Sequence, residues 1–203
     1  MKPVNRTPGR MRACSSVAVA RMRGMTFVEL MVVMVVLGVL VILIAVPAIG
    51  TMASRHRVQG VQAELLGDLQ LARSEQAQRN GTSTPVAVTF GGNADVTCYL
   101  IHTAPDGVAC DCTRAPGAAC LPVDVAQEIK LMTFARVAGV SVAASSPGGA
   151  PIKFVPPQGL VTPGNVVIDV QSATRGQLRT SISGLGVPTV CSPDGSIPGV
   201  RTC

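Results

Sequence analysis

The sequence contains no tryptophan, one tyrosine, four phenylalanines and two histidines among its 203 residues. This scarcity excludes a core made of large rings and predicts one built from Val, Leu, Ile and Ala. It also disfavours single-stranded nucleic acid as a ligand, because such binders stack bases on aromatic side chains. The nucleophile-elbow, zinc-helix and phosphate-loop motifs of common enzyme classes are missing as well. We therefore expect a non-enzymatic protein with no catalytic residue, no metal and no cofactor.

Acidic residues are missing from residues 1–24, a stretch that holds six of the 17 Lys and Arg residues. The other 11 Lys and Arg are balanced by the 11 Asp and Glu, so the formal net charge of +6 belongs wholly to this stretch. A basic segment ahead of an apolar run is typical of a targeting signal. We predict that residues 1–24 form a basic leader peptide that is cleaved, which leaves a mature chain without a net field to attract DNA.

Charged residues are also absent from Leu30 to Ser54, and Leu30–Ile49 is an almost continuous apolar run. About 20 apolar residues in a helix match the ~30 Å hydrocarbon core of a bilayer. Arginines lie just before this run, so the positive-inside rule places the N-terminus in the cytoplasm and the remainder of the chain outside. The pattern predicts one membrane-spanning helix over residues 25–54.

An amphipathic pattern follows the apolar run. Apolar residues recur at steps of three and four, at Val58, Val61, Leu65, Leu69 and Ala72. The positions between them are polar, which predicts a solvated opposite face: Arg57, Gln59, Gln62, Glu64, Asp68, Gln70 and Arg73. Because Asn80-Gly81 is a stop signal, we expect an outer helix over residues 55–81, continuous with the first from Met25 to about Arg79.

Residues 82–203 are rich in Val, Ile and Thr, in short runs separated by Gly, Pro and Asn, which is typical of β-strands. Seven strands are predicted, at Pro85–Phe90, Thr97–Thr103, Glu128–Val137, Val140–Ala144, Pro151–Val155, Val166–Val170 and Gln177–Ser183. Residues 104–123 are predicted to form a loop rich in Cys, Pro and Gly. The fold class is therefore α+β: a long N-terminal helix packed on an antiparallel β-sheet or small β-sandwich head.

Six of the seven cysteines lie beyond the apolar run, at Cys98, Cys110, Cys112, Cys120, Cys191 and Cys203. An even number on the outer side of a membrane indicates disulfides in an oxidising compartment. Cysteines separated by one residue rarely pair, so we expect Cys110 and Cys112 to bond outward to Cys98 and Cys120, and Cys191 to bond Cys203. A metal site with His102 fits less well, because zinc sites prefer wider cysteine spacing. His102 is expected at the surface or at a strand edge.

The junction between leader and apolar run reads Gly24-Met25-Thr26-Phe27-Val28-Glu29-Leu30. A carboxylate at the mouth of a membrane helix needs a partner, because an unpaired charge there is costly. Cleavage after Gly24 would give Met25 a free amine, which could pair with Glu29 of a neighbouring subunit.

This junction resembles the class III signal of type IV prepilins and pseudopilins, with Met25 where Phe is usual. The resemblance implies cleavage by a prepilin peptidase between Gly24 and Met25, methylation of the Met25 amine, and assembly through Glu29. It also implies a single-pass protein of the bacterial inner membrane with a periplasmic head, which joins other minor and major pilins or pseudopilins in a filament.

Two further segments narrow the family. The helix segment Glu64–Glu75 and the segment Phe154-Val155-Pro156-Pro157-Gln158-Gly159 resemble the GspH/FimT family, as does a late glycine before Cys191. This family comprises the H-type minor pseudopilins of type II secretion and FimT-like minor pilins. The resemblance implies a pseudopilus subunit for protein secretion or a subunit for type IV pilus biogenesis.

The FimT branch suggests DNA uptake as the alternative function, through a Gly-Arg-x-Arg segment. The matching stretch here, Gly186-Val187-Pro188-Thr189, lacks both arginines. Arg175, Arg179 and Arg201 remain as candidate DNA contacts. Three scattered arginines on a neutral domain are more typical of a solvated surface, so the sequence favours the filament subunit over the DNA receptor.

Overall fold

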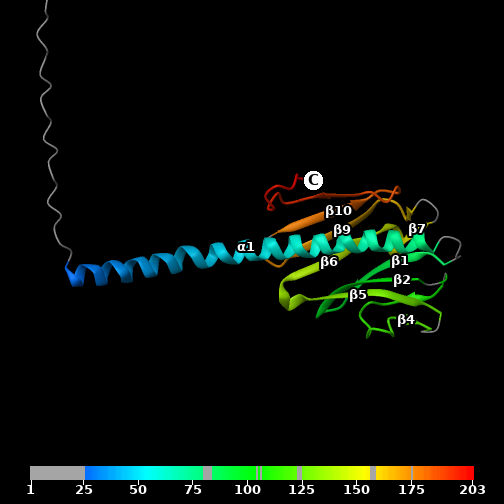
Figure 1. The fold of residues 1–203 in the computed structure, drawn as a ribbon, viewed down its shortest axis with the longest axis horizontal. Helices are drawn as coiled ribbons and strands as arrows, with labels where there is room; N and C mark the ends of the chain where they lie inside the picture. Colours follow the sequence, from blue (N-terminus) through cyan, green and yellow to red (C-terminus); the bar gives the residue numbers. More distant parts are fainter. Residues whose placement is uncertain are drawn as a thin grey trace, which may run out of the picture. The chain divides into compact units, whose positions relative to one another are not determined.

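The structure is a computed structural model that describes residues 26–79, 84–103, 105, 107–122, 125–155, 159–174 and 176–203, without the side chains of residues 44–49 and 148. One long helix, α1 (Phe27–Gln78), is followed by a β-rich region (Figure 1). The chain divides into two compact units, with the boundary between Leu43 and Ile44. The predicted helix from Met25 to about Arg79 is confirmed over its described part.

Two antiparallel sheets make up most of the second unit. The larger sheet has the order β5-β2-β1-β7-β8, from β5 (Gln127–Ala135), β2 (Val96–Thr103), β1 (Val86–Gly92), β7 (Ile152–Val155) and β8 (Leu160–Thr162). The second has the order β11-β10-β9-β6, from β11 (Pro188–Cys191), β10 (Gln177–Ile182), β9 (Val166–Ser172) and β6 (Val140–Ser145). A small hairpin pairs β3 (Ala109–Cys110) with β4 (Cys120–Leu121), and two 3-10 turns follow at η1 (Arg136–Ala138) and η2 (Pro147–Gly149).

All seven predicted strands are confirmed, at β1, β2, β5, β6, β7, β9 and β10, and the α+β class is confirmed with them. Four short strands lie outside the prediction: β3 and β4 inside the expected loop, and β8 and β11 in segments rich in Gly and Pro. Each has two to four residues, which is too short for an alternating pattern to be visible in a sequence.

The C-terminal half of α1 packs against both sheets (Figure 1). Its predicted apolar stripe forms one wall of the core: Val58, Leu65, Leu69 and Ala72 are buried, and Val61 is partly buried. The facing side chains come from both sheets and include Val86, Ile101, Ile152, Ile168, Val170 and Leu178. These are the branched aliphatic residues that the shortage of aromatics predicts.

The polar face of α1 is less solvated than expected, since Gln62 and Asp68 are buried with the apolar stripe. The Gln62 side-chain amide donates a hydrogen bond to Thr180 Oγ1 on β10. Gln76, which is also buried, accepts the Val86 backbone N–H at 2.6 Å and so ties the end of α1 to the start of β1. These hydrogen bonds fix the position of the helix along the sheets, although Gln62 Oε1 and Gln76 Nε2 are buried without a partner among the described residues.

Asp68 lies at the centre of a buried network that joins α1 to the larger sheet. Its two oxygens accept hydrogen bonds from Tyr99 Oη on β2 and Lys130 Nζ on β5, each at 2.7 Å. The hydrogen bond to Asp68 raises the pKa of Lys130, and burial together with Asp68 raises the pKa of Tyr99. Both donors therefore keep their protons across the physiological range.

Two glycines of the segments that resemble the GspH/FimT family occupy positions that exclude side chains. Gly159 and Gly186 have positive φ angles of 64° and 73°. A Cβ on Gly186 would lie 2.9 Å from the Gly159 carbonyl oxygen, and one on Gly159 would lie 2.9 Å from Arg73 Nε. The chain before β8, the chain before β11 and α1 thus meet at a point where only glycine fits.

Candidate functional site

Helix α1 begins at an N-cap threonine. Thr26 precedes the first helical residue, and its Oγ1 accepts the backbone N–H of Glu29 at 3.3 Å. Thr-x-x-Glu is a standard arrangement for a helix start, and a carboxylate in the first turn also interacts favourably with the helix dipole. Glu29 therefore has a local role at the helix start besides the intersubunit role expected from the sequence.

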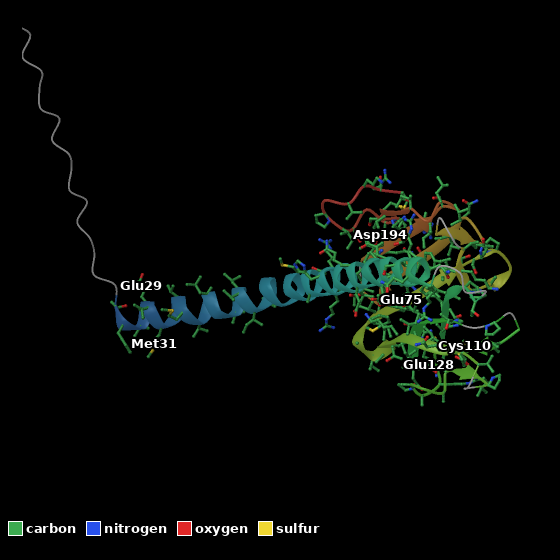
Figure 2. All side chains as sticks on the ribbon, turned by 45° about the vertical axis from the view of Figure 1, so that its right-hand side comes forward. Glu29, Met31, Glu75, Cys110, Glu128 and Asp194 are labelled. Carbon is green, nitrogen blue, oxygen red and sulfur yellow. A yellow bond between two sulfur atoms is a disulfide. The ribbon has the colours of Figure 1, made fainter. Side chains whose placement is uncertain are left out.

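The first part of α1 presents apolar side chains on every side. Every side chain from Thr26 to Leu43 is exposed, and Phe27 keeps 72% of its surface accessible. Figure 2 shows Glu29 and Met31 at the start of this helical segment. A helix that is apolar all round is normally buried in a membrane or in the core of a larger assembly. This surface therefore requires a partner beyond the single chain.

The described residues contain no helix that meets the length and hydropathy criteria for a membrane span.

The predicted cleavage site lies outside the described residues, because both Gly24 and Met25 precede Thr26. Their roles in cleavage and methylation stay predictions. Glu29 is placed in the first turn of α1, and its pairing with a neighbouring subunit stays a prediction as well.

Three disulfides form among the six outer cysteines, as expected: Cys98–Cys112, Cys110–Cys120 and Cys191–Cys203. Cys110 and Cys112 do bond outward, each to a different partner. Cys98–Cys112 attaches the loop that carries β3 and β4 to strand β2, and Cys110–Cys120 links β3 to β4 within that loop. Cys98, Leu100, Cys112, Ala119 and Cys120 form a second small core there. Strand β2 is therefore covered on both of its faces.

The Cys-rich loop is also held by a carboxylate. Glu128 on β5 accepts the Gly117 N–H at 2.7 Å through one oxygen and the Ala119 N–H at 2.6 Å through the other. Hydrogen bonds from backbone N–H groups to a charged oxygen are among the stronger ones in proteins. Glu128 thus fixes the loop beside the Cys110–Cys120 bridge.

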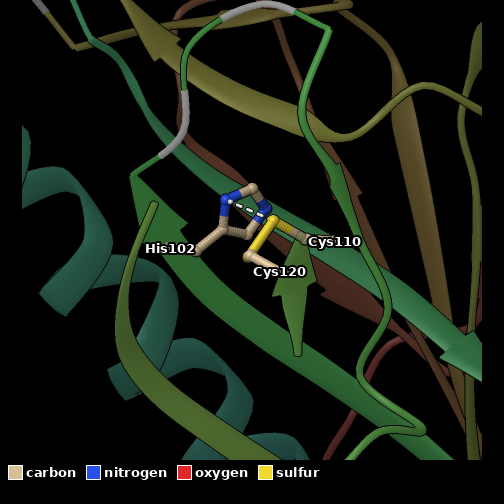
Figure 3. A group of neighbouring side chains, drawn as sticks. All are labelled: His102, Cys110 and Cys120. Carbon is tan, nitrogen blue, oxygen red and sulfur yellow. Dashed lines mark hydrogen bonds between the residues drawn. A yellow bond between two sulfur atoms is a disulfide. The ribbon is translucent and has the colours of Figure 1, made fainter. Parts of the chain in front are cut away.

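His102 is buried, with 4% of its surface exposed, so its expected place at the surface or a strand edge is wrong. Strand β2 is flanked by β1 and β5, and the Cys110–Cys120 bridge faces the imidazole ring (Figure 3). A β-bulge lies between Ile101 and His102, and bulges redirect side chains. The absence of alternation in the run Cys98–Ile101 was the signal in the sequence for a strand buried on both faces.

Both ring nitrogens of His102 have neighbours. Nδ1 lies 3.4 Å from Cys110 Sγ, and Nε2 lies 2.9 Å from Thr89 Oγ1. Because a disulfide sulfur carries no proton, Nδ1 is the donor to sulfur and Nε2 accepts from the Thr89 hydroxyl. Burial lowers the pKa of His102 to about 4, an effect that Glu128 opposes and Lys153 assists. The ring is therefore neutral at pH 7.

His102, Cys110 and Cys120 are also the described residues whose donor atoms gather as metal ligands would, within 4.8 Å of one another. The two sulfurs are bonded to each other, and a metal takes thiolates as ligands. In this oxidised form the cluster is a covered disulfide, and the expectation of no metal stays a prediction.

Two of the three candidate DNA contacts, Arg179 and Arg201, lie among the described residues. Arg179 on β10 makes a bidentate ion pair with Asp169 on β9, with Nε 2.8 Å from Oδ1 and Nη2 2.9 Å from Oδ2. Arg201 is exposed in the C-terminal loop, and Arg175 lies outside the described residues. The Asp169 carboxylate balances the Arg179 charge and occupies two of its donors, so Arg179 links β9 to β10.

The long N-terminal helix with an exposed apolar start, packed further along on antiparallel sheets, defines a type IV pilin-like protein. The profile described as "Prokaryotic N-terminal methylation motif" matches residues 19–45. The profile described as "Type II transport protein GspH" matches residues 62–186, more than half of the chain. The chain belongs to the GspH family.

No curated protein and no solved structure matches the chain. The GspH family consists of structural, non-enzymatic pilin-like components, and the methylation motif is the substrate of prepilin peptidase. The chain is therefore a minor pseudopilin of the type II secretion and type IV pilin class. The family implies processing at the motif, anchoring in the inner membrane and assembly with other pilins or pseudopilins.

Proposed function

We propose that this protein is a minor subunit of a type II secretion pseudopilus, or of the related type IV pilus, and that it supports secretion or pilus biogenesis by joining the filament. The exposed apolar start of α1 carries this proposal. Its surface suits only two surroundings, the hydrocarbon of a bilayer and a bundle of similar helices. A subunit that is stored in the bilayer and then assembled into a helix bundle occupies each of these surroundings in turn.

Transfer between these surroundings need not cost much, because lipid chains and packed apolar side chains are similar solvents for Leu and Val. The charged groups decide the direction. In the membrane, Glu29 and the Met25 amine lie near the surface and are hydrated. In the filament, the Glu29 carboxylate accepts a hydrogen bond from the N-terminal amine of a neighbouring subunit. This ion pair offsets the hydration that both groups lose.

The inner membrane holds the subunit through residues 25–54, and the β-rich head lies in the periplasm. Three disulfides support this orientation, because such bonds persist in oxidising compartments. The positive residues that precede the apolar run support it as well, since they favour the cytoplasmic side.

The decisive experiment separates the two roles of Glu29. Glu29→Gln keeps a side chain that can complete a capping box but removes the charge, whereas Glu29→Ala removes both. We expect the leader to be cleaved in all three proteins, with a methylated Met25 at the N-terminus by mass spectrometry. Cross-linking to partner pilins should fall in both variants to the same extent, because the charge is the group that pairs.

Normal co-assembly of Glu29→Gln would contradict the proposed pairing and leave Glu29 with its capping role alone. An intact leader in cells with an active prepilin peptidase would contradict the proposed processing. Membrane fractionation of the same samples tests the anchor independently of both.

A further inference from the structure

A second polar feature lies on α1 just beyond the apolar run. A cavity of about 440 Å³ is lined by Thr51, Met52, Arg55, His56 and Gln59 of α1 and by Pro198 of the C-terminal loop. None of these lining side chains is acidic. The wall that contains Pro198 belongs to the segment closed by the Cys191–Cys203 bridge, so a covalent link holds the loop around the cavity.

Arg55 is fixed in this cavity with an unused donor. Its Nε is buried and has no hydrogen-bond partner among the described residues. Its stem packs near Gly176, where an added Cβ would lie 3.7 Å from Arg55 Cα and Cγ. An unpaired buried N–H is unfavourable, and a guanidinium that lines the cavity without an acidic neighbour there favours an anionic ligand.

The local charge favours an anion. From Glu29 to Glu64 the chain contains no other carboxylate, and Arg55 and Arg57 are the cations of that stretch, with His56 between them. Arg57 already uses one of its donors, since its Nη1 donates a hydrogen bond to the Ala138 carbonyl oxygen at 3.1 Å. Arg55 is therefore the cation directed at the cavity.

Position along the helix identifies the anion. With a rise of about 1.5 Å per residue, Arg55 lies roughly 9 Å past Ile49, the last residue of the apolar run. Helical side chains lean toward the N-terminus, so the guanidinium reaches back toward the bilayer. The headgroup layer extends about 5–7 Å beyond the hydrocarbon on each side, which places the Arg55 head at the level of lipid phosphates.

We propose that this cavity binds the phosphate of an anionic phospholipid headgroup in the periplasmic leaflet, with Arg55 as the principal ligand and His56 and Gln59 beside it. The site rests on the proposed membrane anchor, and it orients the subunit in the bilayer before assembly. The leader arginines leave with the leader, so Arg55 and Arg57 are the cationic side chains nearest the apolar run in the mature chain.

The test uses the full mature chain, purified in an uncharged detergent and mixed with phosphatidylglycerol and phosphatidylcholine. Native mass spectrometry measures the lipid that stays bound. We expect the wild type to retain phosphatidylglycerol, and Arg55→Gln to bind it about tenfold more weakly, as for the loss of a charge-assisted hydrogen bond. Arg55→Lys keeps the charge without the Nε donor and should lie between the two.

Arg79→Gln is the matched control, because it removes the same charge just after the far end of α1, and it should retain lipid as the wild type does. Circular dichroism confirms that each variant keeps its fold. Equal retention by Arg55→Gln and the wild type would overturn the proposal, as would equal binding of phosphatidylcholine.

Two further arms distinguish other ligands. Inorganic phosphate that binds as tightly as the lipid would overturn the assignment to a headgroup. Cross-linking of residue 55 to a carboxylate of a second subunit, with no lipid retained, would assign the cavity to the filament instead. A wild-type chain found in the aqueous fraction of cells would refute the membrane anchor itself. A membrane-bound chain whose lipid retention does not change with Arg55→Gln would refute only the lipid site.

Discussion

Acidification should weaken the head through His102. In the folded protein, burial lowers the pKa of His102 to about 4, so the ring is neutral at pH 7. In the unfolded chain a histidine has a pKa of ~6.5. Between these values the unfolded chain binds more protons than the folded one, so stability falls as the pH falls. The contribution is present in full above pH ~6.5 and is lost progressively toward pH ~4, by about 3 kcal/mol in total.

The assay follows urea unfolding of the oxidised chain in uncharged detergent from pH 7 to pH 4. Tyr99 is the single tyrosine and is completely buried, so its fluorescence reports the core. His102→Gln removes the titrating group, and the carboxylates common to both proteins cancel in the difference. We expect the free-energy difference between wild type and variant to shrink by about 3 kcal/mol over this range.

Parallel pH profiles for the wild type and His102→Gln would refute the reasoning, because they would mean that the buried ring does not link protonation to unfolding. The control is the other histidine, His56, whose ring is exposed. The profile of His56→Gln should keep the steep fall of the wild type.

Three other predictions concern the head. Asp68→Asn should lower the free energy of unfolding by about 1–3 kcal/mol, because it presents an amide N–H to Lys130. Glu64, whose Oε1 lies 3.5 Å from Lys130 Nζ at the exposed edge of the same network, is the comparison: Glu64→Gln should cost at most about 0.5 kcal/mol, and equal effects in urea titrations would contradict this. Glu128→Ala should release the Gly117 and Ala119 N–H groups and speed their hydrogen exchange at least severalfold, with exchange in β9 unchanged as the internal reference. Duplex DNA should bind the chain with a dissociation constant of about 10⁻⁴ M or weaker at physiological salt, and Arg179→Ala or Arg201→Ala should change it little; submicromolar binding that falls with either arginine would favour DNA uptake.

The sequence predicted the elements of this fold because each long element carries its own pattern. The apolar steps from Val58 to Ala72 match the buried face of α1, and the predicted strands β1, β2 and β5 differ from the observed bounds by one or two residues. Spacing also predicted that Cys110 and Cys112 bond outward and that Cys191 bonds Cys203. These are local properties, which hydrophobic periodicity and chain geometry determine.

The remainder depends on contacts between distant segments. Gln62 and Asp68 look like solvated positions in a helical pattern, and only Thr180, Tyr99 and Lys130 make them interior. His102 is buried because a loop folds back over its strand, which a polar residue near a strand end does not reveal. The cavity at Arg55 needs the C-terminal loop as a wall, some 140 residues further along the chain.

The contacts of α1 with the sheets have a mechanical consequence. Three polar side chains, Gln62, Asp68 and Gln76, hold the helix through hydrogen bonds to β10, β2, β5 and β1. The buried Leu65 and Leu69 pack against the sheets between them. A pull along the helix axis loads all of these attachments in shear at once, whereas a pull across it would break them one after another. In the filament role proposed above, force would enter along the axis, and these attachments would let the head move together with its helix.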